Sequence, residues 1–215
     1  MAGSMLGQDT VRLLAFVVLA GTVAGGILLG MTLRRPRERG PVVAKREPAM
    51  WAEVVWPLVI ALSQLWSVGV LLLSGWFYAW PAVGEFPGPE VVQTAGLVLW
   101  AAGGGLVVWS LRVLGAYMTP SIQVTRGHRL VREGPYARMR HPTYTANIAV
   151  AVGLGLFFLS PPLLLVAVLM AATALHRVGI EEALLRSPEG FGAEYEVYAS
   201  TTGRFLPRIT HRDRR

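Results

Sequence analysis

The chain has 215 residues, of which 53% are hydrophobic and only 15% are charged, with a net charge of +7 and a mean hydropathy of +0.47. Soluble domains carry about a quarter of their residues as charged side chains, so this composition argues against a soluble domain and indicates a membrane protein. The absence of cysteine excludes disulfides, thiolate metal sites and thiol nucleophiles. The four histidines show no paired spacing, so no metal site is expected.

Four long apolar runs follow one another along the chain. Val11–Leu33 is apolar apart from Arg12, Val54–Gly84 carries no charge, and Val91–Leu111 is a third clean run. Each is long enough to cross a hydrocarbon core about 30 Å thick. The basic cluster RRPRER follows the first run instead of preceding it, which is typical of a retained anchor and not of a signal peptide.

The fourth run, Thr145–Leu175, is uncharged but too long for one span. As a single helix its 31 residues would extend roughly 46 Å at 1.5 Å per residue. Ser160-Pro161-Pro162 interrupts it, and proline ends the helix that precedes it. The sequence therefore predicts an all-α integral membrane fold with five transmembrane helices, the last two forming a proline-broken hairpin.

The positions of the basic residues predict the orientation of these spans. Of the 20 Lys and Arg residues, 19 fall in three segments that would share one side of the membrane: Arg34–Ala49, Arg112–Pro142 and His176–Arg215. The connections on the other side, Pro81–Glu90 and Ser160–Pro162, contain none. The positive-inside rule then places the N-terminus outside and the C-terminus in the cytosol. The basic charge is accounted for by topology and by attraction to anionic membrane lipids, so nucleic acid is not an expected partner.

Small residues four apart in the first span mark a close packing face, formed by Gly21, Gly25, Gly26 and Gly30. Packing within one chain is the favoured interpretation, and a homodimer interface is the alternative.

A polar and basic insert, GHRLVREGPYARMRHPTY at Gly127–Tyr144, stands between the third and fourth apolar runs. A Glu pair and the run FGAEYEVY follow the last run. Over about Gln123–Pro207, this combination resembles the isoprenylcysteine carboxyl methyltransferase and phospholipid methyltransferase superfamily. The positions that fill the family pattern are His128, Leu130, Val131, Gly134, Pro135, Tyr136, Arg140, His141, Pro142, Tyr144, Glu181, Glu182, Phe191, Gly192, Tyr195 and Tyr198.

The resemblance implies an integral-membrane enzyme that uses S-adenosylmethionine. It implies a three-span membrane region over residues 1–111 and a catalytic region over 112–215, the latter with a cytosolic cofactor-binding segment and a C-terminal helix. It also implies catalytic roles for Arg140, His141 and Arg177, with Arg177 contacting the acceptor. The implied cofactor-binding residues are Gln123, His128, Arg129, Leu130, Val131, Tyr136, His141, Pro142, Thr143, Tyr144, Glu181 and Glu182.

The residue types suit that cofactor, which has a sulfonium cation and an ammonium group. Tyr136 and Tyr144 offer aromatic faces to a cation or to adenine, and a Glu of the pair can hold the ammonium. Each feature also has a plainer explanation. His141-Pro142 is a common helix start, and Arg177 lies four residues before Glu181, a spacing that allows a surface ion pair.

The predicted function is transfer of a methyl group from S-adenosylmethionine to a lipophilic small molecule or lipid. Arg177 favours a carboxylate acceptor. A phospholipid amine is a second possible acceptor, and it would need a proton acceptor such as His141 or a Glu of the pair. Two rival functions come from different classes of protein. One is an NADPH-dependent membrane oxidoreductase, because membrane sterol reductases have a similar architecture, and the second is a non-catalytic protein that retains the scaffold.

Overall fold

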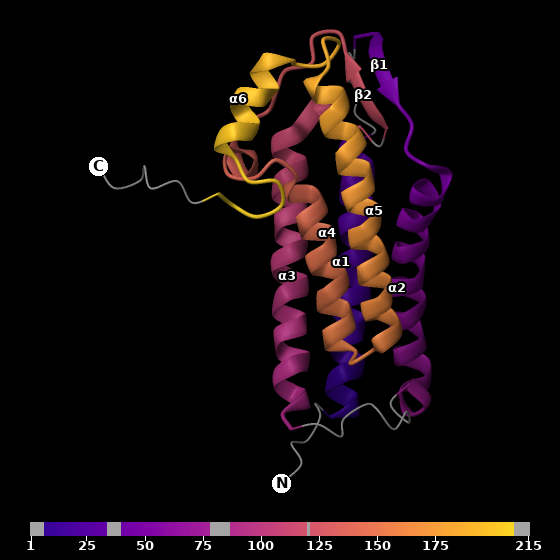
Figure 1. Ribbon diagram of the computed structural model, residues 1–215. Coiled ribbons are helices and arrows are strands. Elements are labelled where there is room, and N and C mark those ends of the chain that lie inside the picture. The colour runs from indigo at the N-terminus through magenta and orange to yellow at the C-terminus, as the bar shows by residue number, and fades with distance from the viewer. Residues whose placement is uncertain (1–6, 34–39, 78–86, 120, 209–215) are drawn as a thin grey trace, which may run out of the picture. The chain divides into compact units, whose positions relative to one another are not determined.

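The computed structural model describes residues 7–33, 40–77, 87–119 and 121–208 (Figure 1). Three features of the sequence lie wholly or largely outside these residues: the basic cluster RRPRER after the first apolar run, the connection at Pro81–Glu90, and the basic C-terminal tail.

The described chain is mostly helical, as predicted, but it also contains two short strands that the all-α prediction missed. The longer elements are α1 (Gln8–Leu33), β1 (Val42–Arg46), α2 (Met50–Phe77), α3 (Pro89–Leu114), β2 (Ile122–Thr125), α4 (Pro142–Phe157), α5 (Pro161–Arg186) and α6 (Ala193–Thr201). Two 3₁₀ turns, η1 (Gly115–Tyr117) and η2 (Gly134–Ala137), lie on either side of β2 in the sequence.

The last apolar run is divided at its prolines. Helix α4 ends at Phe157 and α5 begins at Pro161. Between them Leu159 has a positive φ of 49°, and Ser160 Oγ accepts a hydrogen bond of 3.3 Å from the Leu163 amide. Ser160 therefore caps α5, and proline in the first turn needs no amide partner.

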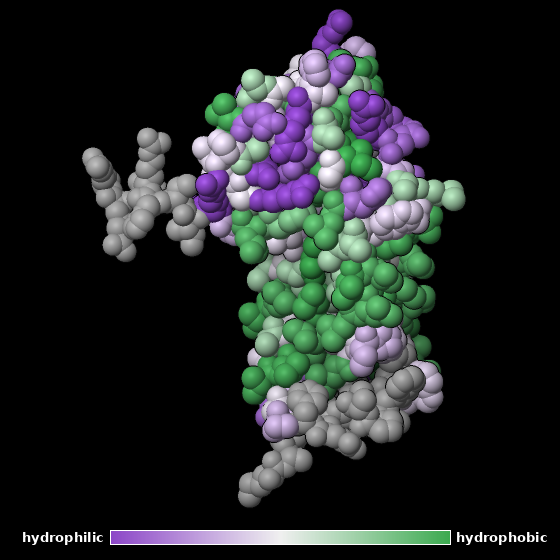
Figure 2. All heavy atoms as spheres, viewed as in Figure 1, coloured by the Kyte–Doolittle hydropathy of each residue, from purple (hydrophilic) through white to green (hydrophobic). Residues whose placement is uncertain are grey.

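Within the residues that the structure describes, two helices have the length and composition of membrane spans, α3 and α5. Helix α4 is apolar but shorter. Helices α1 and α2 expose large apolar side chains, including Leu13 (63%), Phe16 (58%) and Leu72 (73%). Apolar side chains exposed along a helix to this extent are suited to contact with lipid. Figure 2 shows hydrophobic residues over the middle of the surface that faces the viewer.

The described chain forms two compact units, each drawn from three separate segments. The first combines Met1–Pro36, Val55–Ala101 and Ala149–Met170; the second combines Arg37–Val54, Ala102–Ile148 and Ala171–Arg215.

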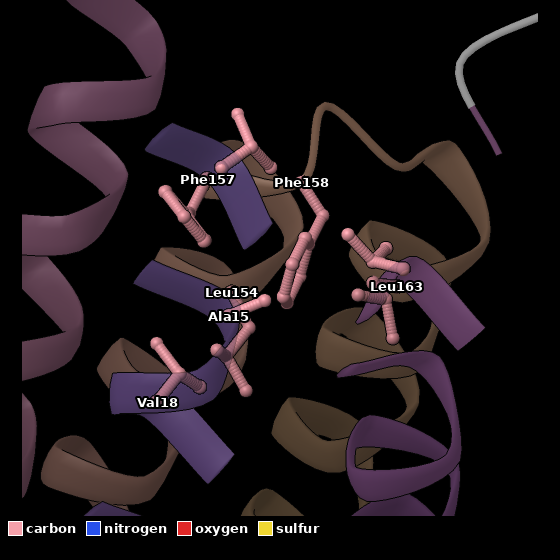
Figure 3. Close-up of a cluster of buried hydrophobic side chains, with 8 residues drawn as sticks. Ala15, Val18, Leu154, Phe157, Phe158 and Leu163 are labelled. Atoms are coloured by element: carbon pink, nitrogen blue, oxygen red, sulfur yellow. The ribbon is translucent and has the colours of Figure 1, made fainter. Parts of the chain in front are cut away.

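The first unit is a helical core in which α3 and α4 approach closely. A methyl group at Gly153 would come within 2.6 Å of the Trp100 amide nitrogen and 2.7 Å of the Gly96 carbonyl oxygen. The buried side chain of Gln93 also connects α3 to α4, because it donates to the Phe157 carbonyl oxygen at 3.2 Å. Aliphatic and aromatic side chains from α1, α2, α4, α5 and the α4–α5 turn fill the interior (Figure 3): Val11, Ala15, Val18, Val70, Leu154, Phe157, Phe158 and Leu163.

The glycine face predicted on α1 is partly used inside this unit. A methyl group at Gly21 would lie 3.2 Å from the Trp100 ring, so this glycine packs within the chain. Gly25 and Gly30 face open space.

The second unit contains an antiparallel ribbon of β1 and β2, in which Arg46 pairs with Ile122 and Lys45 with Gln123. Ile122 and Val124 are buried and cluster with Leu184 of α5. The ribbon is thereby packed against the end of α5 that carries the Glu pair.

Candidate active site

A tight turn leads into η2 at the centre of the polar insert. Gly134 has a φ of +56°, and a methyl group there would lie 2.9 Å from the Val113 side chain. The Tyr136 hydroxyl lies 3.1 Å from Thr143 Oγ1, and the Tyr198 hydroxyl of α6 donates to the Tyr136 carbonyl oxygen at 2.7 Å. Burial raises the pKa of both Tyr136 and Tyr198 to about 12, so both remain protonated at neutral pH.

Glu182 is a buried acid surrounded by three arginines and a histidine. Its side chain is 3% exposed, and its Oε1 accepts from Arg140 Nε at 2.9 Å and from His141 Nε2 at 3.0 Å. Oε2 lies 3.2 Å from Arg186 Nη1 and 3.4 Å from Arg204 Nη2. A carboxylate only accepts, so His141 carries a proton on Nε2. Glu182, Arg140, His141, Arg186 and Arg204 are called the Glu182 cluster below. Both carboxylate oxygens of Glu182 are therefore engaged by side chains of the protein.

Arg140 also ties the end of α6 to this cluster. Its Nη1 donates to the carbonyl oxygens of Ala199 at 2.9 Å and Thr202 at 2.6 Å. With its side chain 11% exposed, Arg140 joins α5 to the C-terminal end of α6. These contacts are those of a residue that positions other groups, and none of them requires Arg140 to touch a reacting atom.

Glu181, next to Glu182 in the sequence, has different surroundings. It is half-buried, and its Oε2 accepts one hydrogen bond of 3.2 Å from the Tyr144 hydroxyl. The same hydroxyl interacts with Arg177, one turn earlier on α5. The Tyr144 ring meets the His141 ring edge to face at 5.9 Å, which joins this group to the Glu182 cluster.

The first half of the polar insert has its own contacts. The His128 ring stacks on Tyr117 at 4.8 Å and meets the edge of Phe191 at 5.6 Å, and burial lowers the pKa of His128, which favours the neutral ring. Arg129 forms an exposed ion pair with Glu133 at 3.0 Å. The contact between the His128 and Phe191 rings explains by packing why these two motif residues occur together.

The structure thus brings together the second half of the predicted site. Arg140, His141, Pro142, Thr143 and Tyr144 lie at the start of α4, opposite Arg177, Glu181 and Glu182 of α5. Five others precede them on β2 and the following loop, and within the described residues no hydrogen bond or ion pair joins these five to the Glu182 cluster: Gln123, His128, Arg129, Leu130 and Val131.

The sequence prediction missed the contribution of residues after α6. Arg204 reaches Glu182 with its side chain, and its carbonyl oxygen accepts from the His141 amide at 3.1 Å. Arg186 shares Glu182 with it and also pairs with Glu196 at 3.0 Å. Only the i, i+4 spacing of Glu182 and Arg186 could have been read from the sequence.

Apolar helix exteriors, with charged residues gathered near the start of α4 and the end of α5, indicate a membrane protein. The chain is similar to the solved structure of the eukaryotic intramembrane Ras methyltransferase ICMT, with a TM-score of 0.51 and 22% identity over 75% of this chain and 63% of that one. Residues 96–187 match the sequence model of the isoprenylcysteine carboxyl methyltransferase (ICMT) family. This match covers less than half of the chain, and together with the similar solved structure it supports the resemblance drawn from the motifs.

A curated relative, the cobalt-zinc-cadmium resistance protein CzcN of Cupriavidus metallidurans, is 35% identical over 89 residues, which are 40% of this chain and 38% of the relative. The chain therefore spans less than two thirds of both the relative and the solved structure. Within the residues that the structure describes, no three His, Asp or Glu side chains form a group able to hold a metal ion.

Proposed function

We propose that this protein is a membrane methyltransferase that uses S-adenosylmethionine to methylate a lipophilic acceptor carrying a carboxylate. The observation that carries the proposal is the arrangement on α5: Arg177 and Glu181 lie one turn apart beside the Tyr144 hydroxyl, next to the Glu182 cluster. A cation and an anion, both half-buried, are thus held close to each other by a fixed framework.

The residues fit the cofactor. S-adenosylmethionine supplies the methyl group when it is bound. Glu181 is the acid proposed to hold the cofactor ammonium. Glu182 is already engaged by three arginines and His141, while Glu181 accepts only from Tyr144 among the described residues. The rings of Tyr136 and Tyr144 are the proposed neighbours of the cationic sulfur and the adenine. Gln123, His128, Arg129, Leu130 and Val131 are proposed to contribute through the backbone and side chains of their loop.

Arg177 is proposed to orient the acceptor. A guanidinium binds a carboxylate with two parallel hydrogen bonds, and a carboxylate nucleophile needs no base. Holding the acceptor in line with the methyl group can remove a large part of the activation barrier, up to about 7–11 kcal/mol. Arg140 and His141 would then act chiefly by holding the start of α4 in place.

Binding of S-adenosylhomocysteine to the detergent-purified protein tests the cofactor assignment. Calorimetry is expected to give measurable heat without any acceptor, because the proposed contacts lie within one unit of the structure. NADPH serves as the comparison ligand. A response to NADPH with none to millimolar S-adenosylhomocysteine would replace this proposal with an oxidoreductase function.

The proposal includes five membrane spans, α1 to α5, with the N-terminus outside and the site in the cytosol. The three-span region, residues 1–111, would shape the acceptor site and residues 112–215 would hold the cofactor. Single cysteines can be placed in this cysteine-free chain and labelled with an impermeant thiol reagent. Pro87→Cys should react in intact cells, and Ser200→Cys only after the membrane is opened. The reverse pattern would invert the topology.

A further inference from the structure

The segment that follows α6, Gly203–Arg208, lies against the residues just before α4. It is called the C-terminal strap below. The Arg140 amide donates to the Gly203 carbonyl oxygen at 2.8 Å, and the His141 amide donates to the Arg204 carbonyl oxygen at 3.1 Å. In the other direction, the Gly203 and Arg208 amides both donate to the Arg138 carbonyl oxygen, at 3.1 and 3.0 Å. Met139 and Gly203 form a parallel β-bridge.

The strap also touches the side chains of the candidate site. Thr145 Oγ1 donates to the Phe205 carbonyl oxygen at 2.7 Å, and the Phe205 ring lies 6.0 Å from the His141 ring. The Arg204 guanidinium reaches Glu182. His141 is therefore held at its amide by Arg204, at its ring by Phe205 and at Nε2 by Glu182.

These contacts satisfy groups that the site would otherwise leave unpaired. The first amides of a helix have no partner within the helix, and the amides of Arg140 and His141 immediately precede α4. His141 is only 4% exposed, so solvent has little access to it. A buried amide without an acceptor is costly, and the strap carbonyls provide both acceptors.

We infer that the C-terminal strap is a positioning element of the cofactor site, which fixes the backbone and ring of His141 before the cofactor binds. This inference rests on the proposed function. It extends the working unit of the enzyme to Arg208, beyond residue 187 where the match to the family ends. A site whose supporting contacts are preformed binds its ligand without having to order those groups first.

Gly203 offers a way to displace the strap without changing any charged group. A methyl group at Gly203 would overlap the Leu206 carbonyl oxygen, which belongs to the strap itself. Gly203→Ala should therefore open the turn and shift the carbonyl of Gly203 away from Arg140. The matched control is Gly105→Ala, since Gly105 lies on the exposed side of α3 with no atom within 4 Å of its added methyl group.

The test uses the full chain in detergent, with three measurements on each variant. Gly203→Ala should bind S-adenosylhomocysteine about tenfold more weakly than the unmodified chain, because the variant must order the start of α4 when the ligand binds. In histidine-labelled protein, NMR should show a shifted imidazole resonance for His141 and an unchanged one for His176. Hydrogen exchange at the amides of residues 140 and 141 should accelerate. Gly105→Ala should match the unmodified chain in all three.

Phe205→Ala keeps the strap backbone and removes only the ring that faces His141, so it remains informative if Gly203→Ala does not fold. It should also shift the His141 resonance and weaken cofactor binding. The inference is refuted if the unmodified chain binds S-adenosylhomocysteine and the folded variants bind it equally well. Failure of the unmodified chain to bind is a different result, because it refutes the proposed function itself.

Discussion

Replacement of Glu182 by alanine should lower the free energy of unfolding by about 3–5 kcal/mol, the usual cost of removing one partner from a buried ion pair. The reason is that Arg140 and His141 would remain buried without an anion, since both donate to the same oxygen of Glu182. Arg186 and Arg204 would lose the same carboxylate but can turn toward solvent, being 38% and 40% exposed. The penalty therefore arises mainly from the two buried groups.

Thermal unfolding in detergent measures this effect. For a chain of this size, 3–5 kcal/mol corresponds to a fall in Tm of roughly 6–20 °C. Glu196→Ala is the control, because Glu196 also pairs with Arg186 but is 59% exposed, and an exposed ion pair contributes about 0–1 kcal/mol. Equal melting temperatures for the two variants would contradict a structural role for the Glu182 cluster.

The helices could be predicted from sequence because each apolar run is long and carries almost no charge. The division between α4 and α5 followed from Ser160-Pro161-Pro162. The ribbon could not be predicted in the same way. Strand β1 has five residues in a charged connection, and its partner β2 begins 76 positions after β1 ends, at Ile122. Pairing at that separation depends on how the helices place the two segments, which no local pattern encodes.

The sequence predicted which residues form the candidate site, but it did not predict the separate role of each residue. The motifs grouped Arg140 and His141 with the Glu pair, and the structure places them in contact. They could not separate Glu181 from Glu182, because neighbouring residues on a helix point about 100° apart and only the packing decides which one is buried. The C-terminal strap was not predictable, since it acts largely through backbone carbonyls, which every residue has.

That difference between the two acids leads to the second large effect, on cofactor binding. Glu181→Ala should weaken the binding of S-adenosylhomocysteine by about 1.5–3 kcal/mol, the value of a hydrogen bond to a charged group, or roughly tenfold or more in affinity. Protein stability should change little, because Glu181 is half-buried and accepts only from Tyr144 among the described residues. Calorimetry and thermal unfolding on the same preparation separate the two quantities.

Arg177→Ala is the matched variant, one turn away on the same helix and beside the same Tyr144 hydroxyl. If Arg177 orients the acceptor, its removal should leave the affinity for S-adenosylhomocysteine within about twofold of the unmodified chain, well under the tenfold that one charged hydrogen bond represents. An equal loss in both variants would mean that Arg177 and Glu181 serve the cofactor together, and the acceptor would then need another partner. A different outcome is unchanged affinity in Glu181→Ala but weaker binding in a folded double variant, Glu181→Ala plus Glu182→Gln. That result would assign the ammonium contact to Glu182. Glu182 would then have to give up its contact with Arg186 or Arg204 in order to bind the ammonium.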